Sequence, residues 1–124
     1  MPVSDDYIDF VRELLAGFEP LRVRRMFGGV GVYSGELFFG ILADDVLYLK
    51  VDDHNRKEYE QRGLEPFTYD TKSGHRVSMS YYPLPSELFE NPEGLDPWVR
   101  GALDAAQRSL RKAASKRAGT PGLK

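Results

Sequence analysis

Residues 23–51 read VRRMFGGVGVYSGELFFGILADDVLYLKV, and the alternation of apolar runs and turn residues in this segment sets the fold class. Each run has the length and the β-branched or aromatic content of a short strand, and turn-forming residues separate it from the next. Breaks this short join antiparallel neighbours, because a parallel pair needs a crossover of a dozen or more residues. We therefore predict an antiparallel meander with strands over Val23 to Phe27, Val30 to Tyr33, Glu36 to Leu42 and Val46 to Val51, and turns at Gly28-Gly29, Ser34-Gly35 and Asp44-Asp45.

The last strand of the meander indicates which side of the sheet is covered. Leu47, Leu49 and Val51 form a purely apolar face, whereas the alternate positions include Tyr48 and Lys50. Successive side chains of a strand point to opposite faces of a sheet. We expect the leucine face to pack against helices.

Helices are predicted on both sides of the meander. Ser4 is placed as the N-cap of the first, in which apolar residues recur at helical spacing. Asp52 or Asp53 is expected to cap a short second helix that closes at Gly63.

The C-terminal part of the chain adds a hairpin and a long helix. Strands are predicted over Phe67 to Thr71 and His75 to Tyr82, joined at Lys72-Ser73-Gly74. The long helix is expected to have Asp96 as its N-cap and Pro97 at its first position. Its apolar stripe consists of Val99, Ala102, Ala106, Leu110 and Ala113.

The predicted order, α-ββββ-α-ββ-α, indicates a two-layer α+β domain with a twisted antiparallel sheet and helices on one face. We expect one domain over residues 1–117 and a disordered tail over 118–124. The chain has 124 residues, is 41% hydrophobic and contains no cysteine, so a disulfide framework and thiolate chemistry are excluded. Its acidic N-terminus and short apolar runs predict a cytoplasmic protein that does not associate with membranes.

Charge is distributed unevenly along the chain. Residues 1–104 hold 11 Lys and Arg against 19 Asp and Glu, a net charge of −8, whereas residues 105–124 hold 6 Lys and Arg and no acid. A basic end on an acidic body can be a nucleic-acid arm. It can equally be a solvated helix end whose cations complement the helix dipole. We favour the second interpretation, because aromatic residues are not interleaved with the cations.

Residues that could carry catalytic or metal chemistry are sparse. Asp44-Asp45 and Asp52-Asp53, with His54, could in principle ligate a hard cation, but the two pairs are better explained as a turn and a helix cap. His75 is the second of two histidines, too few for a zinc site without cysteine. The serines do not form a G-x-S-x-G elbow. We expect no catalytic residue, no metal and no cofactor, although an enzyme of unknown type stays an alternative.

The segment from Arg24 to Tyr33 carries three glycines within four residues. It is neither a P-loop, which needs a following Lys-Ser/Thr, nor a dinucleotide fingerprint, which needs a following helix. We interpret it as a tight turn with close backbone approach, in which Gly31 makes a bulge or touches another backbone. Neighbouring strand residues Arg24 and Arg25 must point to opposite faces, and one of Tyr81 and Tyr82 should lie on the surface. A protein partner is expected to dock here, on Arg24, Arg25, Phe27, Gly28, Gly29, Gly31, Tyr48, Lys50 and Tyr82.

Five blocks of the sequence together resemble the N-terminal domain of the TfoX/Sxy family of bacterial competence regulators. The likeness runs from about Asp5 to Arg111 with its blocks in order. The blocks are Arg24 to Tyr33, Ala43 to Asp52, Gly63 to Tyr69, Met79 to Tyr82 and Leu84-Pro85.

This resemblance implies a fold similar to that of type III secretion chaperones and a regulatory, non-enzymatic role in the bacterial cytosol. It also implies a protein partner, a transcription factor of the cyclic-AMP-receptor type among the candidates, and a homodimer formed through a helix or a strand edge. We expect the separate C-terminal domain of the two-domain regulators to be absent. Nucleic-acid binding through the basic C-terminal helix stays the alternative function.

Overall fold

The computed structural model describes residues 3–26 and 28–119. Five antiparallel strands form the main sheet in the order β1-β2-β3-β4-β7, and a second, two-stranded sheet pairs β5 with β6. The elements are α1 (Asp5–Leu14), a short 3₁₀ turn η1 (Ala16–Phe18), β1 (Leu21–Met26), β2 (Gly29–Ser34), β3 (Leu37–Ala43), β4 (Val46–Lys50), α2 (Arg56–Glu60), β5 (Thr68–Asp70), β6 (Arg76–Ser78), β7 (Tyr81–Pro83), a second 3₁₀ turn η2 (Ser86–Glu90) and α3 (Pro92–Gly119).

The predicted meander is confirmed, with each strand within two residues of its expected bounds where the structure describes them. Asp44 and Asp45 have φ of 51° and 55° and make the tight turn between β3 and β4, the backbone that a two-residue hairpin needs. Asp45 also fastens the N-terminus, because its carboxylate accepts the Ser4 N–H at 3.0 Å. The Ser4 hydroxyl accepts the Tyr7 N–H at 3.1 Å, so the predicted N-cap of α1 is confirmed.

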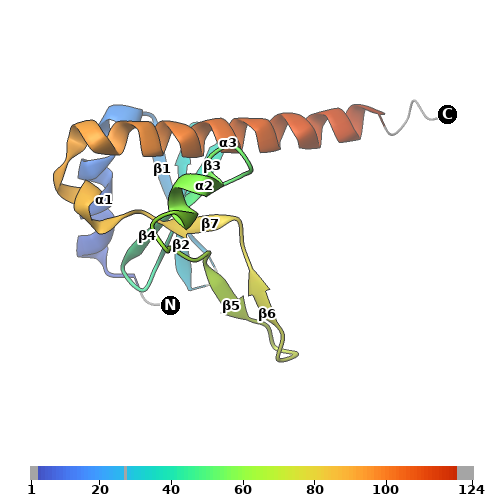
Figure 1. The fold of residues 1–124 in the computed structure, drawn as a ribbon, viewed down its shortest axis with the longest axis horizontal. Helices are drawn as coiled ribbons and strands as arrows, with labels where there is room; N and C mark the ends of the chain where they lie inside the picture. The colour runs from blue at the N-terminus through green and yellow to red at the C-terminus, as the bar shows by residue number, and fades with distance from the viewer. Residues whose placement is uncertain (1–2, 27, 120–124) are drawn as a thin grey trace.

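The predicted strand from His75 to Tyr82 is wrong in one respect: the structure divides it into β6 and β7. The chain changes partners at Met79 and Ser80, where the Met79 N–H bonds to the Phe67 carbonyl and the Ser80 carbonyl accepts the Val51 N–H. The residues of β5 are exposed, whereas Tyr81 and Tyr82 are buried. The segment with apolar mass on both faces therefore joins the main sheet. The polar hairpin projects from the body (Figure 1).

Two predicted helix caps are also wrong. The long helix begins at Pro92, four residues before Asp96, and the Asn91 side chain accepts the Gly94 N–H at 3.1 Å. Proline suits the first helical turn, so the Asn91-Pro92 pair makes an earlier start than Asp96-Pro97. At the second helix, Asp52 opens the preceding turn, and Asn55 occupies the cap position of α2.

Helices cover one face of the main sheet, as predicted. A row of cross-strand partners runs Val23, Val32, Gly40, Leu49 and Tyr82 across all five strands on that face. A bulge between β2 and β3 leaves Phe39 opposite no single partner and places it in this core. The core joins α1, through Ile8 and Val11, and α3, through Val99, Ala102 and Ala106, to Val30, Val32, Phe39, Leu42, Leu47 and Leu49.

Only the first part of the predicted stripe on α3 is buried. Leu110 is 43% exposed and Ala113 is also exposed, because α3 continues past the edge of the sheet (Figure 1). The helix extends to Gly119, and residues 120–124 of the predicted tail lie outside the described residues. No helix in the described part of the chain is long and apolar enough to cross a membrane.

Candidate functional site

A row of cross-strand partners also crosses the other face of the sheet, which we call the open face. It runs Arg24, Gly31, Ile41, Tyr48 and Pro83, one residue from each strand. Because partners in register project to the same side, three of the predicted partner-binding residues are brought into one line. Lys50 follows Tyr48 by two positions on β4 and shares this face.

Arg24 and Arg25 lie on opposite faces of β1, as predicted, and both are exposed. Arg25 lies on the helix side, where its guanidinium meets the Asp5 carboxylate of α1 at 2.7 Å. Both partners of that pair are largely exposed, so it contributes little to stability. Arg24 lies on the open face and makes no ion pair with any residue that the structure describes.

The glycine turn is built for close approach. Gly28 has φ of 79°, which favours glycine. A Cβ on Gly29 would lie 2.8 Å from the Leu42 carbonyl oxygen, so the expected contact with another backbone falls on Gly29 and not on Gly31. At Gly31 a Cβ would meet the side chain of Met26 at 2.6 Å. Phe27, also predicted as a partner-binding residue, lies outside the described residues.

Aromatic rings and cations alternate along the open face. Tyr33 stacks on Phe38 with a centroid distance of 4.9 Å, and the Arg22 guanidinium lies 4.7 Å from the Tyr33 ring. The Lys50 ammonium lies 5.0 Å from the Tyr81 ring, and burial lowers the pKa of Lys50. Since protein neighbours already lie against the Tyr33 ring, it is a poor platform for a nucleobase. Aromatic residues and arginine are enriched at protein interfaces, and here the half-buried Tyr33 and Phe38 lie beside Arg22.

The prediction that one of Tyr81 and Tyr82 lies on the surface is wrong. Tyr81 is 4% exposed and Tyr82 is 6% exposed, and they occupy opposite faces of β7. Tyr81 packs beside Phe38, whereas Tyr82 packs against Tyr59 of α2. Both faces of β7 are covered, so Tyr82 cannot contribute to an exposed docking surface.

An open groove of about 700 Å³ separates the projecting hairpin from the edge of the main sheet. We call it the aromatic groove. Tyr48 and Phe67 lie 4.9 Å apart and Phe67 and Tyr69 6.4 Å apart, measured between ring centroids. The groove is lined by Asp44, Tyr48, Gly63, Leu64, Glu65, Pro66, Phe67, Thr68, Tyr69, Asp70 and Pro83.

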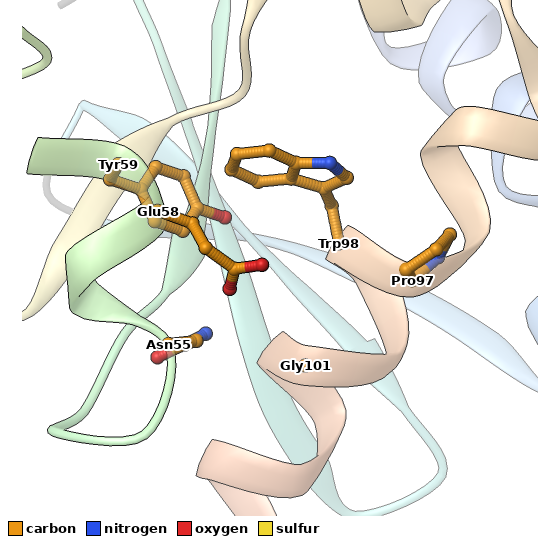
Figure 2. A pocket seen from close by; sticks show the side chains of 6 residues that line it. All are labelled: Asn55, Glu58, Tyr59, Pro97, Trp98 and Gly101. Atoms are coloured by element: carbon orange, nitrogen blue, oxygen red, sulfur yellow. The ribbon is translucent and has the colours of Figure 1, made fainter. Parts of the chain in front are cut away.

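A second, much smaller cavity lies between α2 and α3 (Figure 2). Its volume is about 40 Å³, which suits one or two water molecules and no organic ligand. Tyr59 borders it, 1% exposed and edge-on to Trp98 at 4.8 Å, and its hydroxyl bonds to no described protein atom. Burial raises the pKa of Tyr59, so this hydroxyl is neutral at every physiological pH. We interpret the cavity as a packing feature of the helix layer.

The carboxylate pairs and histidines serve local structure. Asp44 and Asp45 make the β3–β4 turn, and the Asp52 carboxylate accepts the His54 N–H at 2.9 Å. The Ser73 Oγ lies 3.0 Å from the His75 Nδ1 in the hairpin turn, where both residues are exposed. Within residues 3–26 and 28–119, His, Asp and Glu side chains form no group of three or more that could hold a metal ion.

The basic end of the chain is partly engaged by the body. Arg108 donates two hydrogen bonds to Asp52, so its charge is compensated within the domain. Arg111 and Lys112 follow on the overhanging part of α3, where both are exposed. A nucleic-acid arm would therefore begin after Arg108.

Residues 13–106 match the family model of the TfoX N-terminal domain. They contain all the strands and the buried part of α3. The chain belongs to this family. It is also similar to the DNA transformation protein TfoX1 of Aliivibrio fischeri (strain ATCC 700601 / ES114), with 26% identity over 118 residues. The match covers 93% of this chain and 54% of that relative, so the chain spans about half of the relative's length.

The aromatic groove of this TfoX N-terminal domain was not among the features predicted from the sequence. One polar and two aromatic residues, Glu65, Phe67 and Tyr69, follow one another at every second position. This spacing places them on one side of an extended segment and is the sequence signal for the groove. The sequence does not indicate that β5 pairs outside the main sheet, in a separate two-stranded sheet with β6. That departure opens the space between Tyr69 and Tyr48.

Proposed function

We propose that this TfoX N-terminal domain is a regulatory protein-interaction module that acts in the control of DNA-uptake competence, in the cytoplasm and without catalysis. The protein partner docks on the open face of the sheet, around Arg24, Tyr48 and Lys50. The name of the Aliivibrio fischeri relative, a DNA transformation protein, supports the role in competence. The exposed and half-buried residues of the open face support docking of a protein partner.

The observation that carries the proposal is the row from Arg24 to Pro83. It begins with the Arg24 guanidinium, which makes no ion pair with any described residue, and continues through Gly31 and Ile41 to the half-buried Tyr48 before it ends at Pro83. Gly31 is buried, with the side chains of Met26 and Phe38 against it, so Arg24 and Tyr48 are the residues of the row that a partner would contact. Arginine and tyrosine are enriched among the residues that dominate binding energy at protein interfaces.

Charge reversal at Arg24 tests the proposal in cells. Arg24→Glu, introduced at the native locus, is expected to lower transformation frequency by about tenfold or more, because a guanidinium at an interface is worth on the order of 1.4 kcal/mol or more. Lys72→Glu reverses an exposed charge in the β5–β6 turn and is the matched control. The steady-state level of each variant is measured by immunoblot.

Two results would count against the proposal, and they separate its parts. If deletion of the gene for this chain leaves the transformation frequency unchanged, the proposed role in competence is wrong. A full effect of deletion together with wild-type behaviour of Arg24→Glu would keep that role but remove the open face as the docking surface.

A further inference from the structure

We propose that the aromatic groove binds an extended segment of a protein partner that carries lysine or arginine. This inference rests on the proposed function in one respect, since it takes the partner to be a protein. It adds a second contact surface and the chemistry of the segment that fills it.

The shape of the groove suits an extended chain. Thr68, Tyr69 and Asp70 of β5 line it, whereas β6 does not, so the edge of β5 that faces away from β6 borders the groove. Within the described chain β5 pairs only with β6. A strand edge with free N–H and C=O groups accepts an added strand through main-chain hydrogen bonds.

The aromatic residues of the groove provide surfaces for a cation. Tyr69 is 40% exposed, while Phe67 beneath it is buried. Tyr48, half-buried, borders the groove from the β4 side. A lysine or arginine side chain can lay its aliphatic stem along such rings and bring its charge over a ring face.

The charges of the groove select a cationic segment. The described residues that line it include three carboxylates, from Asp44, Glu65 and Asp70, and no lysine or arginine. Arg76 engages Asp70 at 3.2 Å, whereas Asp44 and Glu65 make no ion pair with any residue in the described ranges. Burial raises the pKa of Tyr48 and the Asp44 charge raises it further, so the Tyr48 hydroxyl lies within the field of the Asp44 carboxylate. A nucleic-acid backbone would be repelled here.

The same chemistry could be supplied by a second copy of the chain, through the exposed Arg111 and Lys112 of α3. We favour a separate partner, because a helix cannot add to the β5 edge. A sedimentation experiment, described below, tests the second copy as the occupant.

Binding of short peptides to the full chain tests the inference. The probe is a blocked eight-residue peptide of alternating threonine and lysine, with glutamine or glutamate in place of lysine in two matched peptides. Dissociation constants and amide chemical shifts are measured by NMR at about 50 and about 300 mM salt, concentrations that bracket strong and weak screening. We expect the lysine peptide to bind at least about tenfold more tightly than the glutamine peptide at low salt, with shifts at Thr68 to Asp70.

Variants locate the site. Tyr69→Ala should weaken binding of the lysine peptide by about fivefold, whereas Tyr69→Phe keeps the ring and should stay within about twofold. Glu65→Gln and Asp44→Asn should each weaken binding and reduce its salt dependence. Glu60→Gln, on α2 and away from the groove, is the control. Asparagine tolerates the positive φ of position 44, so the turn is kept.

The inference is overturned if the lysine and glutamate peptides bind equally, if the shifts fall elsewhere, or if nothing binds at millimolar concentration. Sedimentation of the chain alone shows whether a second copy fills the groove. A salt-sensitive dimer that both Glu65→Gln and Arg111→Gln disrupt would identify the second copy as the occupant and would overturn the inference of a separate partner. Peptide binding is measured without any native partner, so its failure is distinct from a failure of the transformation assay with Arg24→Glu.

Discussion

Arg108 and Asp52, 56 positions apart, form a two-pronged ion pair that ties α3 to the turn after β4. The Arg108 Nε lies 2.6 Å from Asp52 Oδ2, and Nη2 lies 2.9 Å from Oδ1. The same carboxylate accepts the His54 N–H at 2.9 Å. The hydrogen bonds from Arg108, first among several causes, lower the pKa of Asp52 from 3.8 to about 2.

Loss of this pair should destabilise the domain more than loss of an ordinary surface pair. Arg108→Gln is expected to lower the free energy of unfolding by about 1–2 kcal/mol, because a part-buried bidentate pair is held in one geometry. Asp96→Asn breaks the exposed pair with Arg100 on the same helix but keeps the Arg100 guanidinium over Phe18, and should cost about 0.5 kcal/mol or less. Urea denaturation measures the free energy of unfolding of both variants. Equal decreases would show that the Arg108–Asp52 pair is no stronger than a surface pair.

Stability should fall in acid through Asp52. Its pKa is lower in the folded state than in the unfolded state, so its contribution is present above about pH 4 and is lost as the pH falls toward about 2. The full linkage value would be about 2 kcal/mol, and solvent screening reduces it to about 1–2 kcal/mol. Asp52→Asn should flatten the decline of unfolding free energy between pH 5 and pH 2. Asp9→Asn, at an exposed position of α1 outside every ion pair of the described residues, is the control.

The meander could be predicted because local signals and tertiary structure agree there. The turn residues Ser34-Gly35 and Asp44-Asp45 leave no alternative to short antiparallel connections, and the apolar face of β4 is buried as its alternation indicates. The start of α3 was misplaced because Asn91-Pro92 and Asp96-Pro97 are both good start signals. The sequence does not say which one the packing will use.

The candidate surface was predicted only in part, and long-range pairing explains the difference. That Arg24 and Tyr48 share a face depends on the registers of three strand pairs, each fixed by its neighbours. The Asp52–Arg108 pair depends on the direction in which α3 crosses the sheet. Neither is a local property, so the sequence predicted only a solvated basic helix end around Arg108 and not its pair with Asp52.

Gly29 and Gly31 should differ in their tolerance of alanine. A Cβ at Gly29 would lie 2.8 Å from the backbone oxygen of Leu42, which cannot move without distorting β3, so Gly29→Ala should cost about 2 kcal/mol or more. At Gly31 the nearest atom is the mobile end of Met26, so Gly31→Ala should cost about 1 kcal/mol or less. Thermal unfolding of the two variants checks the order, and a larger loss at Gly31 would contradict it.

Tyr59 should tolerate loss of its hydroxyl but not of its ring. The ring packs against Tyr82 and Trp98 at centroid distances of 5.3 and 4.8 Å, whereas the hydroxyl bonds to no described protein atom. Tyr59→Phe is therefore expected to change the unfolding free energy by less than about 1 kcal/mol, and Tyr59→Ala to lower it by about 3–5 kcal/mol. A loss of several kcal/mol in Tyr59→Phe would show that the hydroxyl has an essential partner in solution.

Duplex DNA should bind the chain only weakly, through the overhang of α3. Fluorescence anisotropy is expected to give a dissociation constant above about 1 µM at physiological salt, the range of non-specific binding. The dependence of log affinity on log salt concentration should become shallower by about 2 in the double variant Arg111→Gln/Lys112→Gln. Each phosphate contact releases about one counterion on binding, and this variant loses two such contacts. Point substitutions suit this test better than a truncation after Gln107, because truncation would also remove Arg108 and leave Asp52 without its partner. Arg24→Gln, on the open face, is the control and should leave the slope unchanged. Affinity below about 10 nM that survives high salt would instead make nucleic acid the partner, and the open face would lose its assigned role.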